Sequence, residues 1–423
     1  MAFIWRKQQS LPPWASLLLI FAFMIPGPAR VEAQAEPLVL TLERAIALGF
    51  ENDEALLQAG QAIAGARAEV MQAKSNALPQ LTLSGHYGRN FLKPSFFLPE
   101  EFREDPDAPT KVEMGEDNDF VGTAAITQIL WAAGRVSAGL VAAREFLEAF
   151  RFQEIAVADY VRFNVQEAYF GVLLAAEILQ IAEKAFQETE EAFRVARAGF
   201  DQGTASRFDV MRAEVELANR KAPLVKATND LGQAMIVLRR RCGIDPGTEI
   251  SLADSLEAVL HPADVETLMA AMREGSAEVR ALEHQIEVRR QFLRISKAER
   301  YPILQFSAVY GIQTQWSEGI MPEKDRIAYN AGVTLGLQIP IFDGLNAKGK
   351  INKSRADLRA AELELEKVTR DKELAVRRSC LNLENALTAL EGRREAVRLA
   401  EEAYRLALVR MQNGLATPLE RLD

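Results

Sequence analysis

The sequence predicts an α+β membrane protein with an internal duplication, in which long antiparallel coiled-coil helices adjoin four membrane-spanning β-strands. Three observations predict this class: an export signal at the N-terminus, a plan of helices and strands that occurs twice, and strand segments that alternate apolar with small or polar residues. An exported chain without a second long apolar run can cross a membrane only as part of a closed β-barrel. The membrane part is therefore expected to be a barrel.

The N-terminus has the layout of a secretory signal peptide. Arg6 and Lys7 precede the apolar run ASLLLIFAFMI (15–25), and PGP and the small residues of VEAQA follow it. The alternative is an N-terminal membrane anchor, but this apolar run is too short to cross a bilayer comfortably. We therefore expect residues 1–35 to be a signal peptide. No cysteine follows that could carry a lipid anchor.

The mature chain is two copies of one plan. SNALPQLTLSGHYG (75–88) aligns with AERYPILQFSAVYG (298–311) at an offset of 223, and beyond the strands an offset of 211 pairs Gly203 with Gly414. The difference of 12 residues falls in the loop after the Tyr-Gly pair, where a true structural duplication tolerates changes of length. The predicted domains are a signal peptide, a first repeat and a second repeat, at 1–35, 36–260 and 261–423.

The predicted helices follow the same order in both copies. Each copy opens with a helix of about 35 residues, expected at 41–76 and 264–300, and a proline closes each one (Pro79 and Pro302). A much longer helix of about 65–70 residues starts after WAAG or FDG and runs to a glycine turn. In the first copy a return helix is expected at 206–241.

The long helices show the seven-residue spacing of a coiled coil. In the second one, Ile351, Leu358 and Leu365 fall seven apart, and Ser354 and Ala361 occupy interleaved positions, which permits close antiparallel packing. A helix of this length has too little apolar surface to build a globular core. We therefore predict a coiled coil or a helical barrel.

Four segments alternate in the manner of β-strands, near 81–87, 120–128, 303–313 and 329–339. Segments of about ten residues, apolar on one side and small or polar on the other, are typical of outer-membrane barrels. A half-buried soluble sheet alternates too. The export signal, the tyrosines near the strand ends and the acidic, proline-containing loops at 90–119 and 316–326 favour the barrel.

Four strands are too few to close a barrel, because about eight are needed to enclose even a packed interior. The chain is therefore expected to oligomerise. A trimer would supply twelve strands and an open lumen.

The same short turn occurs once in each copy. A glycine is followed three residues later by a hydroxyl residue and six residues later by an acid: Gly203, Ser206 and Asp209 in FDQGTASRFDVMRAE, and Gly414, Thr417 and Glu420 in RMQNGLATPLERLD. Glycine can adopt the positive φ that ends one helix, the hydroxyl can cap the next, and the acid suits the positive end of that helix. An ordinary capped helix–turn–helix explains the pattern equally well.

The chain resembles the TolC-like outer-membrane efflux channels, the outer membrane factors of tripartite efflux and type I secretion systems. The resemblance covers nearly all of the mature chain. It rests on the duplicated plan, the strand entries LPQL and YPIL, the junctions QILWAAGR and QIPIFDG, and the turns GTASRFDV and GLATPLERLD. The junctions depart from the commoner pattern at Ile129, where proline is usual, and at Leu345, where glycine is usual.

The resemblance implies a homotrimer in the outer membrane, with a twelve-stranded barrel and an α-helical barrel that crosses the periplasm. The expected function is a passive exit duct, served by a periplasmic adaptor (membrane fusion) protein and an inner-membrane pump of the RND, ABC or MFS type. The helix tips would contact the adaptor, through Gly203, Ser206, Asp209, Val210, Gly414 and Thr417. An acidic ring at the periplasmic entrance would be formed by Glu420 and Asp423, for which a solvated helix start is the alternative.

The composition excludes several other classes of function. The chain of 423 residues has a formal net charge of −9, which argues against nucleic acid as a partner because phosphate binding favours a basic face. Its two cysteines and three histidines are dispersed and predict neither a disulfide framework nor a metal site. No nucleophile–base spacing or phosphate-binding loop is present. We therefore expect no enzyme, no catalytic residue and no cofactor.

Two rival interpretations remain open at the level of sequence. The second copy has nine residues after Gly414, against about 35–40 after Gly203, so the second return helix is expected to be missing. The chain would then be a fragment of a longer channel or a truncated, non-conducting homologue. The other rival is an exported coiled-coil scaffold or adhesion protein.

Overall fold

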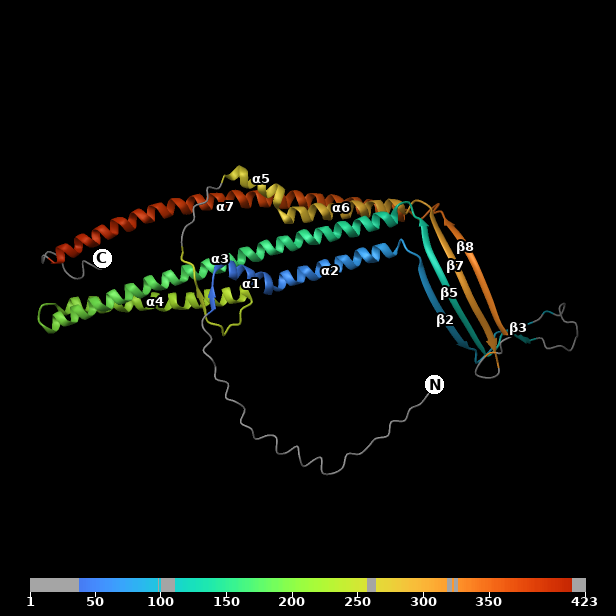
Figure 1. Cartoon of the computed structure of the whole chain (residues 1–423), viewed down its shortest axis with the longest axis horizontal. Coiled ribbons are helices and arrows are strands. Elements are labelled where there is room, and N and C mark those ends of the chain that lie inside the picture. The colour runs from blue at the N-terminus through green and yellow to red at the C-terminus, as the bar shows by residue number, and fades with distance from the viewer. Residues whose placement is uncertain are drawn as a thin grey trace, which may run out of the picture.

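The computed structural model describes residues 38–97, 99, 111–256, 264–317, 322 and 326–412. The molecule is elongated, with long helices that run together from one end towards a four-stranded sheet at the other (Figure 1). The expected signal peptide, residues 1–35, lies outside the described residues.

The first repeat contains four helices and the strands of the first half of the sheet. In chain order these are β1 Leu38–Leu40, α1 Leu42–Asn52, α2 Glu54–Ser75, β2 Gln80–Arg89, β3 Ser95–Phe97, β4 Lys111–Glu113, β5 Asn118–Trp131, α3 Arg135–Asp201, α4 Arg207–Cys242 and β6 Ile250–Leu252. The second repeat follows with α5 Val265–Gly275, α6 Ala277–Ala298, β7 Ile303–Trp316, β8 Ile327–Gln338 and α7 Asn346–Gln412.

The internal duplication is confirmed by the lengths of the matching helices. α1 and α5 have 11 residues each, α2 and α6 have 22 each, and α3 and α7 have 67 each. The strand-to-helix junctions match as well, because two consecutive residues have positive φ in both: Ala133 and Gly134 (51° and 79°), and Gly344 and Leu345 (66° and 70°). Leu345 therefore occupies a left-handed position, which costs a residue with a Cβ about 1–2 kcal/mol.

The opening helix of each repeat is not continuous, which corrects the prediction of single helices at 41–76 and 264–300. Asp53 ends α1 with extended backbone (φ −69°, ψ 121°), and its side chain accepts hydrogen bonds from the N–H groups of Ala55 and Leu56 to start α2. Ser276 separates α5 from α6 with similar backbone angles. At Asp53 a short polar side chain offers the backbone this alternative to a continuous helix, whereas Ser276 makes no side-chain capping hydrogen bond. Apolar periodicity reveals neither break.

The four predicted barrel strands form one antiparallel sheet in the order β2-β5-β7-β8. β5 pairs with β7, so the two repeats meet in the middle of the sheet, and β2 and β8 are its edges. Two short pairs were not predicted from the sequence: a parallel pair of β1 with β6, and a hairpin of β3 with β4 inside the loop expected at 90–119.

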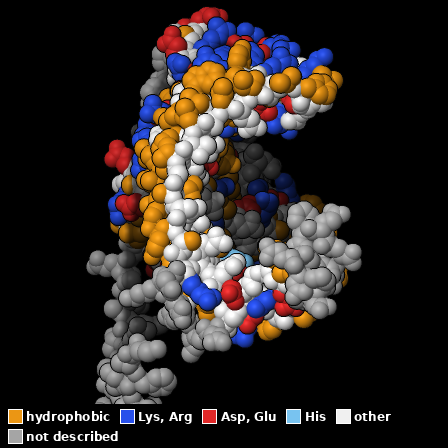
Figure 2. Space-filling model, turned by 90° about the vertical axis from the view of Figure 1, so that its right-hand side faces the viewer, with side chains coloured by type: hydrophobic (Ala, Val, Ile, Leu, Met, Phe, Trp, Pro, Cys, Tyr) orange, Lys and Arg blue, Asp and Glu red, His pale blue; other side chains and the backbone are white. Residues whose placement is uncertain are grey.

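The sheet has one apolar face and one polar face. Leu83, Tyr310, Val333 and Leu335 point to the apolar face, and all four are exposed within the single chain. Figure 2 shows hydrophobic side chains gathered along one side of the sheet, while the other side borders a hollow and is mostly uncharged. This arrangement confirms the alternation that predicted a barrel wall.

The long helices pack side by side. α3 lies between α4 and α6 and also contacts α1 and α2, while α7 packs against α5 and α6 (Figure 1). α3 contains an 18-residue window of mean hydropathy 1.3, one third of it buried, which meets the length and composition criteria for a membrane span. The core helix of a long bundle meets the same criteria, and α3 is the helix that contacts most of the others.

The most buried cluster lies where the helices meet the β1–β6 pair. Leu40, Val165, Tyr169, Leu238 and Cys242 are all fully buried there. Burial raises the pKa of the Cys242 thiol to about 11, because the apolar surroundings disfavour the thiolate. Cys242 is thus a free thiol buried in the core of the helices.

Candidate functional site

The turn between α3 and α4 lies at the end of the molecule farthest from the sheet (Figure 1). Gly203 has φ +76°, and the N–H groups of Thr204 and Ala205 both donate to the carbonyl of Gly199, at 2.8 and 3.2 Å. The Thr204 hydroxyl donates to the same carbonyl at 3.1 Å. The end of α3 is therefore satisfied within a few residues, as the sequence predicted for a glycine turn.

Ser206 caps α4 with both halves of a capping box. The Ser206 hydroxyl accepts from the Asp209 N–H at 3.2 Å, and the Asp209 carboxylate accepts from the Ser206 N–H at 3.1 Å and from its hydroxyl at 2.7 Å. The predicted roles of Ser206 as cap and Asp209 as first-turn acid agree with this geometry. The N–H groups of Ser206 and Asp209 are therefore both satisfied within the capping box.

The hydrogen bonds from the Ser206 hydroxyl and N–H hold the pKa of the Asp209 carboxyl below its usual value. A depressed carboxyl pKa contributes stability that is present above the ordinary pKa of an aspartate and is lost as the pH falls through the folded-state value. The Asp209 carboxylate is therefore ionised at neutral pH, where its part of the capping box is present.

The apolar side chains at this tip differ from those that sequence reasoning selected. Val210 is half-buried, whereas Phe208 is 72% exposed and Met211 is 56% exposed. Val210 is the first residue on the side of α4 that packs on α3. Phe208 and Met211 are three residues apart and therefore share a different face of the first turns of α4. Helical spacing from the buried Ala213 could have identified them.

The second tip lies outside the described residues. Its residues Gly414, Thr417, Glu420 and Asp423 were expected to form the other half of the adaptor contact and the acidic entrance ring.

Two stripes of residues run along α4, each repeating every seven residues, and we call them seams. Among the described residues, only one of the two seams is covered by another helix. The first seam of α4 faces α3, and its residues are three and four positions apart in alternation: Val210, Ala213, Leu217, Arg220, Leu224, Ala227, Leu231, Ala234 and Leu238. The second seam has the same spacing and every member is exposed: Met211, Val215, Ala218, Ala222, Val225, Asn229, Gly232 and Ile236.

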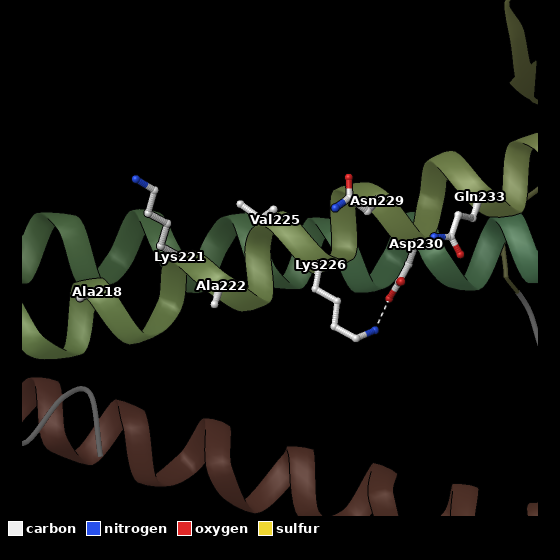
Figure 3. Close-up of a pocket in the computed structure, with 8 residues that line it drawn as sticks. All are labelled: Ala218, Lys221, Ala222, Val225, Lys226, Asn229, Asp230 and Gln233. Atoms are coloured by element: carbon white, nitrogen blue, oxygen red, sulfur yellow. Dashed lines mark hydrogen bonds and ion pairs between the residues drawn. The ribbon is translucent and has the colours of Figure 1, made fainter.

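A shallow groove follows the middle of the exposed seam. Ala218, Ala222, Val225 and Asn229 line it, together with long side chains from the same helix (Figure 3). Lys226 and Asp230 form an ion pair of 2.5 Å beside it. Small residues at alternating spacings of three and four permit another helix to approach closely.

Within the described residues, no group of three or more His, Cys, Asp or Glu side chains is placed to hold a metal ion. His284 has a structural environment: its Nδ1 lies 2.7 Å from Glu145 Oε2, and its ring stacks on Phe152 at 5.3 Å between centroids. These contacts join α6 to α3.

The comparisons with known proteins agree with this architecture. Residues 46–243 and 268–423 match the family model described as outer membrane efflux protein. The chain is 25% identical over 386 residues to the protein CyaE of Bordetella pertussis, which covers 86% of this chain and 76% of CyaE. It is 24% identical over 345 residues to the alkaline protease secretion protein AprF of Pseudomonas aeruginosa, covering 76% of this chain and 68% of AprF.

The fold is also that of solved outer-membrane proteins. The crystal structure of the outer membrane protein VceC from Vibrio cholerae superposes with a TM-score of 0.71 at 19% identity, over 90% of this chain and 88% of VceC. This likeness confirms the expected combination of a helical region with an antiparallel barrel sheet.

Proposed function

The chain belongs to the outer membrane efflux protein family, and we propose that three copies of it close a continuous duct through which substrates leave the cell. Membership confirms the expected place in the outer membrane of a Gram-negative bacterium and the expectation that the chain is not an enzyme. The trimer, the partners and the contact residues are inferences from the geometry.

The observation that carries the trimer is the open sheet. Its apolar face suits lipid, yet no described strand pairs with the outer edges of β2 and β8. Unpaired backbone groups are too costly in a bilayer, so each edge must pair with another strand. If β8 of one copy pairs with β2 of the next, three copies of a four-stranded sheet close a twelve-stranded barrel.

The exposed seam on α4 supports the same assembly. A helix with a single seam needs only the partner it has in a hairpin, whereas a second seam requires a neighbour on its other side. In a closed wall of helices each helix has two neighbours. The second seam therefore fits a helical barrel better than an isolated coiled-coil scaffold.

The α3–α4 tip is the proposed contact for a periplasmic adaptor protein, which would connect the duct to an inner-membrane pump of the RND, ABC or MFS type. Gly203, Ser206 and Asp209 give the tip a fixed shape, and Phe208 offers the exposed apolar side chain. On this proposal Val210 supports the tip from its α3-facing side. The second tip and the acidic entrance ring at Glu420 and Asp423 are proposed from their sequence spacing.

Cargo is proposed from the relatives. AprF is, by its name, a secretion protein for an alkaline protease. We propose that this chain likewise carries substrates supplied by a pump, either exported proteins or small molecules, with the pump making the choice.

Channel formation is tested with the purified full chain. Stepwise conductance in planar bilayers is expected, together with heat-modifiable trimers in outer-membrane fractions. Each readout checks a different part of the proposal, because trimers show assembly and conductance shows an open lumen. Absence of both would favour the scaffold and contradict the channel.

The adaptor contact is tested by placing a photo-cross-linking residue at Phe208 in cells that co-express a candidate adaptor and pump. We expect an adduct with the adaptor, since Phe208 projects from the tip. The control position is Tyr160, which is 63% exposed and lies in the middle of α3. Equal yields at the two positions, or an adduct at Tyr160 alone, would contradict the tip as the contact surface.

A further inference from the structure

We propose that Asp119 makes the outer end of the duct selective for cations, with one carboxylate from each copy on the lumen side of the barrel. The inference rests on the proposed trimer. It concerns the end of the sheet next to the β3–β4 hairpin, far from the helix tips and from the acids expected at the periplasmic entrance.

The register of the sheet shows which residues share the polar face. Pairing of β2, β5, β7 and β8 in turn places alternate residues of each strand on one side. Of the strand residues that the structure describes, those on this face are small, hydroxyl, amide or aliphatic, with one histidine and one acid: Gln80, Thr82, Ser84, His86, Gly88, Asp119, Val121, Thr123, Ala125, Thr127, Ile129, Ile303, Gln305, Ser307, Val309, Gly311, Gln313, Gln315, Ala328, Asn330, Gly332, Thr334, Gly336 and Gln338. None of these is a lysine or arginine.

The residue opposite Asp119 leaves space for the Asp119 side chain on the polar face. It pairs with Gly88 on β2 and with Gln315 on β7. A Cβ built on Gly88 would lie 2.5 Å from Asp119 Oδ1, so the carboxylate occupies the space that the missing side chain leaves. Glycine at this position therefore allows the carboxylate to lie across β2 on the polar face.

The other acids near this end have cationic partners. Lys93 Nζ lies 2.9 Å from Asp117 Oδ1, and Arg326 Nη1 lies 3.2 Å from Glu116 Oε1. The Ser317 hydroxyl joins the two pairs, because it accepts from Lys93 Nζ at 3.2 Å and donates to Glu116. Among the described residues no ion pair involves Asp119, so its charge remains to act on the lumen.

In the trimer the three carboxylates would form a ring in a neutral, hydroxyl- and amide-lined barrel. Acidic rings favour cations over anions in pores, and lumen substitutions in outer-membrane barrels tune selectivity. A wall of twelve strands about 4.8 Å apart and tilted by about 40° lies roughly 12 Å from the pore axis, and charges carried on it are screened by salt. Their effect is therefore largest at low ionic strength.

The test measures the reversal potential of the purified trimer in planar bilayers under a KCl gradient. Asp119→Asn is expected to lower the cation-to-anion permeability ratio about threefold near 0.1 M salt, where the Debye length is about 10 Å. The difference should nearly vanish near 1 M salt, where the Debye length falls to about 3 Å. Unit conductance at high salt should be unchanged, because the two side chains have nearly the same size.

Glu113→Gln is the matched control. Glu113 is an exposed acid on β4 at the same end, but it pairs with Lys111 at 3.3 Å and lies off the barrel sheet. We expect its selectivity to equal that of the unmodified chain. Conduction with an unaltered permeability ratio in Asp119→Asn, or an equal loss in Glu113→Gln, would overturn the assignment to Asp119 alone. Trimers that never conduct would overturn the proposed function and this inference with it.

Discussion

Val333→Arg is expected to prevent assembly of the chain in the outer membrane, whereas Thr334→Arg is expected to leave assembly intact. Val333 pairs with Ala308 near the middle of β8, lies on the apolar face and is 74% exposed in the single chain. In the proposed barrel its side chain meets lipid. An arginine near the bilayer midplane costs about 2–4 kcal/mol, and each trimer would carry three of them.

The neighbouring position provides the control. Thr334 pairs with Ser307 on the polar face, so an arginine there would extend into a water-filled lumen. Both variants carry the same added charge on adjacent residues of the same strand, and only the face differs. The measurement is the amount of heat-modifiable trimer in outer-membrane fractions.

Two other outcomes of this comparison would contradict the proposed barrel. If both variants assemble normally, the apolar face does not contact lipid and the barrel is wrong. If only Thr334→Arg fails, the faces are reversed and the polar side would have to be the packed one.

Local sequence was sufficient where a feature depends on neighbouring residues. The Gly203 turn, the Ser206 cap and the place of Asp209 in the first turn of α4 were predicted because a helix end is set by the side chains within a few positions of it. The strands and the 67-residue helices were predicted because their periods differ and persist over many residues.

Other features depend on contacts that periodicity does not encode. Strand alternation assigns residues to faces, but it does not show that β5 pairs with β7 and joins the repeats, which places Asp119 opposite both Gly88 and Gln315. The exposure of Phe208 was missed for a similar reason, since the pattern indicates a face but not what covers it. Leu345 shows the reverse case: the departure from glycine was visible in the sequence, and its left-handed backbone was not.

The second seam on α4 is identified by combining the spacing of residues in the sequence with the packing of helices in the structure. Its spacing is readable in the sequence once the first seam is known, and the structure shows that α3 covers only one of the two. A helix this long is stabilised chiefly by its lateral neighbours. The uncovered seam and the unpaired strand edges therefore point to the same assembly from opposite ends of the molecule.

Tyr169→Ala is expected to lower the free energy of unfolding by about 3–5 kcal/mol, and Tyr169→Phe by about 1–3 kcal/mol. Tyr169 is fully buried, and its single hydroxyl proton is shared between the Leu40 carbonyl at 3.0 Å and Asp254 Oδ2 at 2.7 Å. Asp254 also accepts from the Leu42 N–H at 3.1 Å. One hydroxyl thus ties α3 to β1, to the start of α1 and to the segment after β6.

The contribution of this hydroxyl should depend on pH with a defined sign. Its hydrogen bond, together with the Leu42 N–H, holds the pKa of the Asp254 carboxyl below its usual value. The stabilisation is therefore present above the ordinary aspartate pKa of about 4 and is lost as the pH falls through the lower folded-state value. The difference between the unmodified chain and Tyr169→Phe should narrow in acid. Thermal unfolding in detergent, followed by helical circular dichroism at several pH values, measures both the size and the trend.

Tyr160→Phe is the control on the same helix, because Tyr160 is 63% exposed. We expect a change within about 0.5 kcal/mol, as for most surface substitutions. An equal loss at the two positions would show that loss of any tyrosine hydroxyl from α3 weakens the fold. A difference at Tyr169 that stays constant down to strongly acid pH would remove the carboxylate of Asp254 from the explanation and leave the Leu40 carbonyl as the partner that matters.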